Sequence, residues 1–150
     1  MKLNIPYHKQ KNDYFCGPAS LQMIFEYYKK PKSQDQIGKE AKTNFHSGTL
    51  HKNMIKTALR NGFYCYINKS STINKVKHLI DMKIPVIVNY IEPSDNEIHY
   101  AVVIGYKKDT IILNDPWNGK NLKLKEKFFI SRWLDYHKHR KYNQGIIVLT

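Results

Sequence analysis

The sequence predicts an α+β fold in which helices near the amino terminus pack on a mostly antiparallel sheet. Apolar residues recur at helical spacing in the first third of the chain, and later β-branched runs are separated by short polar turns. Helices followed by strands, without regular alternation, are typical of the α+β class. No repeat or linker divides the sequence, and 150 residues suit one sizeable core. We therefore expect residues 1–150 to form a single domain.

Apolar spacing and capping signals predict four early helices, near residues 18–30, 33–42, 54–59 and 73–82. The first begins at Pro18, a residue favoured in the first helical turn, and ends before Pro31. Ser33 and Gln36 have the spacing of a capping box, which indicates the start of the second helix. The Asn61-Gly62 pair is typical of a helix end and stops the third helix.

The remaining chain is expected to supply strands and one late helix. Strands are indicated at 63–67, 85–91, 98–106, 110–114 and 146–149. The short polar turn between 98–106 and 110–114 favours an antiparallel hairpin of these two strands. The spacing of Phe129, Trp133 and Tyr136 predicts a helix between the hairpin and the last strand.

The chain is strongly basic, with 25 Lys plus Arg against 12 Asp plus Glu and a net charge of +13. Such a charge favours anionic partners. However, the lysines are scattered singly and no nucleic-acid-binding motif is present, so an ordinary solvated basic surface is the better interpretation and nucleic acid is not an expected partner. A salt-dependent complex with DNA or RNA would revive that alternative.

Cysteine and histidine spacing gives no indication of a metal or an organic cofactor. The two cysteines, Cys16 and Cys65, lack the CxxC pattern of zinc ribbons and redox pairs, although a single bridge between them is conceivable. His137 and His139 lie in a basic segment that is expected to be a solvated face. No signal-peptide pattern and no run long enough for a membrane span is seen, so we expect a cytoplasmic protein, and a monomer.

Three short segments have the residue types that covalent catalysis by a thiol requires. Cys16 lies just ahead of the first predicted helix, and the positive end of a helix dipole lowers a cysteine pKa. His99 opens one hairpin strand and Asp115 ends the other, so antiparallel pairing can bring a base and its orienting carboxylate together. Gln10, six residues before Cys16, is placed to donate its amide to an oxyanion.

These segments together resemble the bacteriocin-processing, double-glycine leader peptidases, a branch of the papain-like cysteine peptidases. The resemblance covers the Gln10-to-Cys16 spacing, then Cys-Gly-Pro-Ala-Ser at 16–20, Pro-Val-Ile at 85–87, His-Tyr-Ala-Val-Val-Ile-Gly at 99–105 and Asn-Asp-Pro at 114–116. It implies a papain-like fold with Cys16 as nucleophile, His99 as base, Asp115 as its orienting partner and Gln10 as oxyanion donor. It also implies a peptide or protein substrate.

The sequence departs from that family at the residue before the cysteine, which is Phe15 where an acidic residue is usual. Cleavage after a Gly-Gly leader is therefore not carried over, and the expected reaction is hydrolysis of a peptide or isopeptide bond. An amidase or acyltransferase on the same triad, and a catalytically silent peptide-binding module of the same fold, are the alternatives. Trp117 is expected to cap the core beneath the hairpin rather than to shape a groove.

Overall fold

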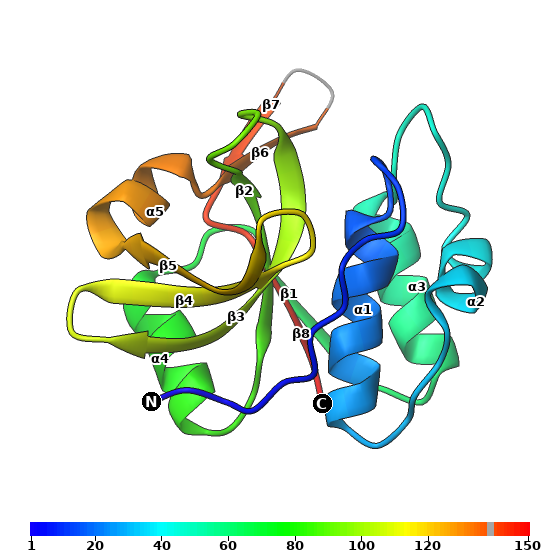
Figure 1. The fold of residues 1–150 in the computed structure, drawn as a ribbon, viewed down its shortest axis with the longest axis horizontal. Coiled ribbons are helices and arrows are strands. Elements are labelled where there is room, and N and C mark those ends of the chain that lie inside the picture. Colours follow the sequence, from blue (N-terminus) through cyan, green and yellow to red (C-terminus); the bar gives the residue numbers. More distant parts are fainter. Residues whose placement is uncertain (138–139) are drawn as a thin grey trace.

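The first three helices of the chain lie to one side of a central sheet, and the fourth and fifth lie to its other side (Figure 1). The structure, a computed structural model, describes residues 1–137 and 140–150, with side chains described outside 135–143. Its helices are α1 (Cys16–Tyr27), α2 (Gln34–Glu40), α3 (His51–Arg60), α4 (Ile73–Asp81) and α5 (Glu126–Arg132). Its strands are β1 (Cys65–Asn68), β2 (Val86–Ile91), β3 (Ile98–Lys107), β4 (Thr110–Asp115), β5 (Gly119–Lys125), β6 (Leu134–His137), β7 (Arg140–Asn143) and β8 (Ile146–Leu149).

The main sheet has six antiparallel strands in the order β1-β8-β2-β3-β4-β5, and β6 pairs with β7 separately. The central strands are buried over most of their length, as their β-branched sequences predict. This arrangement of helices and antiparallel strands confirms the α+β prediction.

Helix α1 packs against β3 and provides much of the contact between the helices and the sheet. Leu21, Ile24 and Phe25 are fully buried, and the Phe25 ring stacks on Phe63 with 4.9 Å between ring centroids. The first turn of α1 lies very close to Thr49. A Cβ atom on Gly17 would be only 2.7 Å from the Thr49 hydroxyl oxygen, which is too close for a side chain. Only glycine at position 17 permits this approach.

The amino-terminal segment connects the sheet to the start of α1. The backbone N–H of Leu3 donates to the carbonyl of Ile104 at 2.7 Å, which holds the segment along β3. Farther on, the backbone N–H of Gln10 donates to the carbonyl of Pro116 at 3.0 Å. Residues just before Cys16 are thereby fixed beside the turn that follows β4.

Most expected elements are present with shifts of up to three residues, but several expectations need correction. The late helix ends at Arg132 instead of continuing to Tyr136, because Trp133 is tied to the far side of the following hairpin. Its indole N–H donates to the carbonyl of Gly145 and its own carbonyl accepts from Gln144. The first strand begins at Cys65 and not at Phe63, and β5, β6 and β7 were not expected. The expectation that His137 and His139 belong to a solvated face concerns side chains outside the part of the chain that the structure describes.

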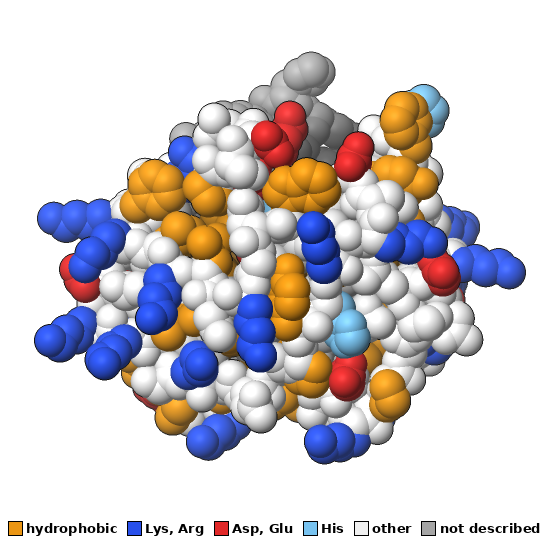
Figure 2. All heavy atoms as spheres, viewed as in Figure 1, with side chains coloured by type: hydrophobic (Ala, Val, Ile, Leu, Met, Phe, Trp, Pro, Cys, Tyr) orange, Lys and Arg blue, Asp and Glu red, His pale blue; other side chains and the backbone are white. Residues whose placement is uncertain are grey.

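The basic residues are spread over the surface as the sequence suggests. Figure 2 shows Lys and Arg side chains distributed across the face that includes β3, β4 and β5. On β5, Lys123 and Lys125 are exposed and alternate with Leu122 and Leu124. Among the described residues, no helix combines the length and apolarity that crossing a bilayer requires.

Candidate active site

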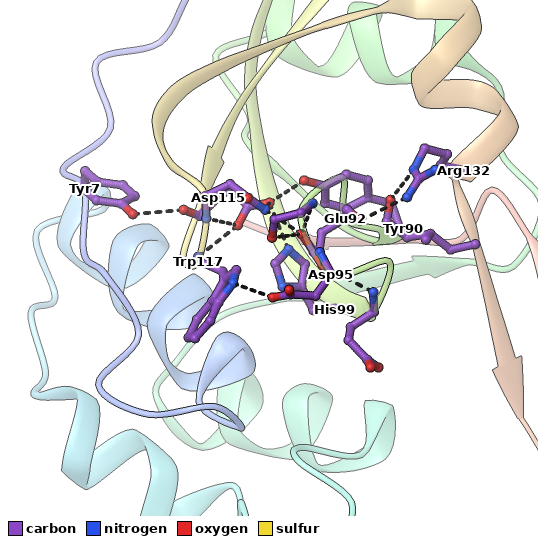
Figure 3. Close-up of polar contacts among 12 residues, drawn as sticks. Tyr7, Tyr90, Glu92, Asp95, His99, Asp115, Trp117 and Arg132 are labelled. Carbon is purple, nitrogen blue, oxygen red and sulfur yellow. Dashed lines mark hydrogen bonds and ion pairs between the residues drawn. The ribbon is translucent and has the colours of Figure 1, made fainter.

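His99 and Asp115 meet at one end of the β3–β4 hairpin. Nε2 of His99 lies 2.8 Å from Oδ2 of Asp115, and both side chains are buried (Figure 3). The pairing of Val102 with Asn114 sets this register, because it places the start of β3 beside the end of β4. The hairpin predicted from sequence thus brings together the two residues expected to form the base and its orienting partner.

The Asp115 carboxylate accepts hydrogen bonds at both oxygens. Oδ1 accepts from the backbone N–H groups of Trp117 at 2.8 Å and Asn118 at 2.9 Å, and Oδ2 accepts from the Tyr90 hydroxyl as well as from His99. Burial alone would raise the pKa of Asp115, but the hydrogen bonds from His99 and Tyr90 hold it below its usual value. Asp115 is therefore ionised near neutral pH and accepts the Nε2 proton of His99, which leaves Nδ1 as the basic ring nitrogen.

Cys16 is the first residue of α1, and its side chain is partly buried. The backbone N–H of Tyr100, the residue after His99 on β3, hydrogen bonds to the thiol. The sequence predicts a lowered pKa for this thiol, and that prediction is wrong. Burial raises the pKa of Cys16 to about 11, since loss of hydration outweighs the hydrogen bonds from Tyr100 and Gly17.

Gln10 is buried beside the turn that carries Asp115. Its side-chain Nε2 donates to the carbonyl of Asn12 at 2.7 Å, and an amide nitrogen has a second hydrogen to donate. Its Oε1 is buried and has no hydrogen-bond partner among the described residues. The backbone bond to Pro116 holds Gln10 beside the residue that follows Asp115, and the side-chain bond to Asn12 leaves one amide hydrogen uncommitted.

The chain matches the model of the peptidase C39-like family over residues 2–141. This chain belongs to the peptidase C39-like family. The match extends across the candidate site, because it includes the cysteine, histidine and aspartate segments together with Gln10.

Individual relatives agree with the family assignment. The transport/processing ATP-binding protein ComA of Streptococcus pneumoniae is 29% identical over 94% of this C39-like chain, which spans only 21% of that relative. The crystal structure of the peptidase domain of Streptococcus ComA superimposes with a TM-score of 0.78 at 24% identity, covering 96% of both chains. A double glycine motif protease from an AMS/PCAT transporter, crystallised with its leader peptide, gives a TM-score of 0.75 at 23% identity, covering 99% of this chain and 92% of that one. These likenesses identify the fold as that of C39 peptidase domains, which are papain-like.

Two residues of the candidate site were not found by sequence reasoning. Tyr90 lies directly across from His99 in the pairing of β2 with β3, and its hydroxyl reaches Asp115. Glu92 is buried at the end of β2 and accepts from Asn118, which also lies 3.4 Å from Asp115. The signal for Tyr90 was a single tyrosine in a β-branched run, which becomes informative only once the strand register is known.

Trp117 does not cap the core as expected. Its side chain is 38% exposed, and its indole N–H donates to Asp95 in the loop between β2 and β3 at 3.1 Å (Figure 3). The backbone N–H of Trp117 donates to Asp115, and its ring remains partly exposed instead of packing into the core.

The other described histidines lie in separate environments. His8 pairs with Glu26 of α1 at 2.5 Å, while His51 contacts Asn89 at 2.7 Å. Among the described residues, no three His, Cys, Asp or Glu side chains are grouped so as to hold a metal ion.

Proposed function

We propose that this chain is a cysteine peptidase that hydrolyses a peptide bond, with Cys16 as nucleophile, His99 as base and Asp115 as the residue that orients His99. The observation that carries the proposal is the buried bond between His99 Nε2 and Asp115 Oδ2. Cys16 starts α1, and its thiol interacts with the backbone of Tyr100, the residue after His99. Nucleophile, base and orienting carboxylate are the components of a catalytic triad. Membership in the peptidase C39-like family supports the same reaction class.

The chemistry begins from a neutral thiol. His99 Nδ1 takes the Cys16 proton as the sulfur attacks the substrate carbonyl carbon, because burial disfavours a thiolate formed in advance. His99 then gives that proton to the departing amine, which breaks the peptide bond and leaves a thioester on Cys16. Water attacks the thioester, its proton passes to His99, and the carboxylic acid product leaves as the thiol is restored.

The oxyanion formed in each step needs donors beside the sulfur. We assign this role to the Cys16 backbone N–H and to the second amide hydrogen of Gln10. The bond from Gln10 to Asn12 uses one amide hydrogen and holds the amide group in place. The second amide hydrogen can therefore bind the oxyanion with little reorganisation of the side chain.

The substrate is proposed to be a peptide or a segment of a protein. A structural neighbour, a double glycine motif protease, was crystallised in complex with the leader peptide, which makes double-glycine peptides the first class to test. Phe15 takes the place of the family's usual acidic residue and is buried against Gly38 of α2. Position 15 therefore contributes packing between two helices here rather than charge.

The test is incubation of the chain with synthetic peptides that contain a Gly-Gly pair, and with matched peptides that lack it, followed by mass spectrometry. We expect products with a free carboxyl terminus at one bond. Cys16→Ala should abolish cleavage, and Cys65→Ser should leave it intact. Products that carry an added amine would indicate acyl transfer instead, and stoichiometric peptide binding without product would indicate a binding module.

A further inference from the structure

Tyr90 contacts the Asp115 carboxylate from a strand to which the proposed mechanism gives no role. The Tyr90 side chain is completely buried, and its hydroxyl donates to Oδ2 of Asp115, the same oxygen that accepts from His99 (Figure 3). A buried hydroxyl requires a partner, and this one has a charged partner at the centre of the site.

The strand register makes this contact specific. Tyr90 pairs directly with His99 between β2 and β3, so both side chains project from the same face of the sheet, with ring centroids 5.5 Å apart. The Phe129 ring of α5 packs against the Tyr90 ring in a tilted arrangement, with 5.9 Å between ring centroids. Packing from α5 and pairing with β3 therefore restrict the hydroxyl to the direction of Asp115.

We infer that Tyr90 is a positioning residue for the His99–Asp115 pair. Its hydroxyl holds Oδ2 of Asp115 in line with Nε2 of His99 and withdraws negative charge from Oδ2. This inference rests on the proposed function. A carboxylate held by His99 alone would be free to rotate about its last bond. Here Oδ2 accepts from Tyr90, His99 and, at 3.4 Å, the Asn118 side chain, and Oδ1 accepts from two backbone N–H groups, so the plane of the carboxylate is fixed.

The hydroxyl stays a donor throughout the working pH range. Burial, followed by the negative charge of Asp115, raises the pKa of Tyr90, so the phenol does not ionise under mild conditions. Several titratable or charged groups from the surrounding elements face this pair: Tyr7 of the amino-terminal segment, Cys16 of α1, Glu92 after β2, His99 of β3 and Arg132 of α5.

Removal of the hydroxyl has a defined electrostatic consequence. The Tyr90 hydrogen bond is one of the interactions that lower the pKa of Asp115, so Tyr90→Phe should move the Asp115 titration to higher pH. The ionised carboxylate is the functional form, and activity is lost as pH falls through the pKa of Asp115. In the variant, the acid side of the rate profile should therefore shift upward in pH.

The test compares Tyr90→Phe with Tyr106→Phe, a matched control that removes an exposed hydroxyl bonded to Asp81. Carboxyl ¹³C NMR in a Cys16→Ala background should show the Asp115 titration shifted only in Tyr90→Phe, and this readout requires no turnover. In the active chain, kcat should fall by up to about 100-fold with little change in KM, the size expected from loss of alignment. Tyr106→Phe should resemble the unsubstituted chain in both measurements.

The possible outcomes separate this inference from the proposed function. An unchanged Asp115 titration in Tyr90→Phe, with only a lower melting temperature, would overturn the positioning role. If the unsubstituted chain cleaves no peptide, the proposed function fails while the NMR comparison still decides the role of Tyr90. If Tyr90→Phe does not fold, the unsubstituted chain should show a slowly exchanging, downfield Tyr90 hydroxyl proton, and its absence would also overturn the inference.

Discussion

Nε2 of His99 lies 2.8 Å from Oδ2 of Asp115, a contact between the start of β3 and the end of β4. Because Asp115 is ionised, it determines which ring nitrogen of His99 has the proton. The orientation of the imidazole and its tautomer thus depend on one carboxylate, which is itself fixed by backbone and side-chain donors.

Asp115→Asn should reduce kcat severely while preserving the fold. The amide oxygen of asparagine would accept from the backbone N–H groups of Trp117 and Asn118, which leaves its NH₂ group facing His99. His99 would then accept at Nε2 and hold its proton on Nδ1, where a base is required. We expect kcat to fall on the order of 10⁴-fold with KM little changed. Steady-state kinetics and ¹⁵N NMR of the His99 tautomer test this, and a normal tautomer with normal kcat would contradict it.

Alkylation of Cys16 should require higher pH than alkylation of a free thiol. Burial raises the pKa of Cys16 to about 11, so the thiolate fraction near neutral pH is small in the resting chain. Iodoacetamide rates for the Cys65→Ser variant, which retains Cys16 alone, should rise with pH above the ~8.5 of a free cysteine. The Cys16→Ala variant retains only Cys65, and its alkylation rate across the same pH range is the comparison. A midpoint below that of a free thiol would instead indicate a preformed ion pair with His99.

Gln10→Ala should affect turnover more than stability. Loss of one oxyanion donor typically costs on the order of 100- to 1,000-fold in kcat, with substrate affinity nearly unchanged. Gln34→Ala is a matched control, because Gln34 bonds the carbonyl of Lys9 and the N–H of Lys11 in the same segment. We expect Gln34→Ala to lower the melting temperature and retain kcat. Equal kcat in the unsubstituted and Gln10→Ala chains would rule out the oxyanion assignment.

Local sequence signals were sufficient for the elements that hold the expected catalytic residues. The capping box at Ser33 is present with both of its hydrogen bonds, and the β-branched runs on either side of the Lys107–Asp109 turn do form the hairpin. These features depend on neighbours within a few residues, which the sequence displays directly.

The features that were missed depend on distant partners or on burial. Strand β5 has only Leu122 and Leu124 as apolar positions between lysines, because one side of this edge strand faces solvent. Trp133 has helical spacing but is drawn away from α5 by its bond to Gly145. The raised pKa of Cys16 follows from packing of α1 on β3, which no local pattern records.

A final prediction concerns Glu92, whose carboxylate organises the loop between β2 and β3. It accepts from the hydroxyl and N–H of Ser94, from the N–H groups of Asp95 and Glu97, and from Asn118. Burial would raise the pKa of Glu92, but these hydrogen bonds outweigh burial and lower it to about 2. The stabilisation is therefore present above the unfolded-state pKa of about 4.3 and is lost as pH falls toward 2.

Glu92→Gln should lower the free energy of unfolding at pH 7 by about 2 to 3 kcal/mol, the usual contribution of hydrogen bonds to a buried charge. Asp95 and Asn118 on either side would lose their common acceptor, so Trp117 should also become more mobile, with a shift in its fluorescence. Glu97→Gln, an exposed change in the same loop, is the control and should be nearly neutral.

Urea unfolding from pH 7 to pH 3 measures both variants. The difference between Glu92→Gln and the unsubstituted chain should shrink as pH falls, because acid protonates the carboxylate that the substitution replaces. A difference independent of pH would show that Glu92 stabilises the loop by packing and not through its charge.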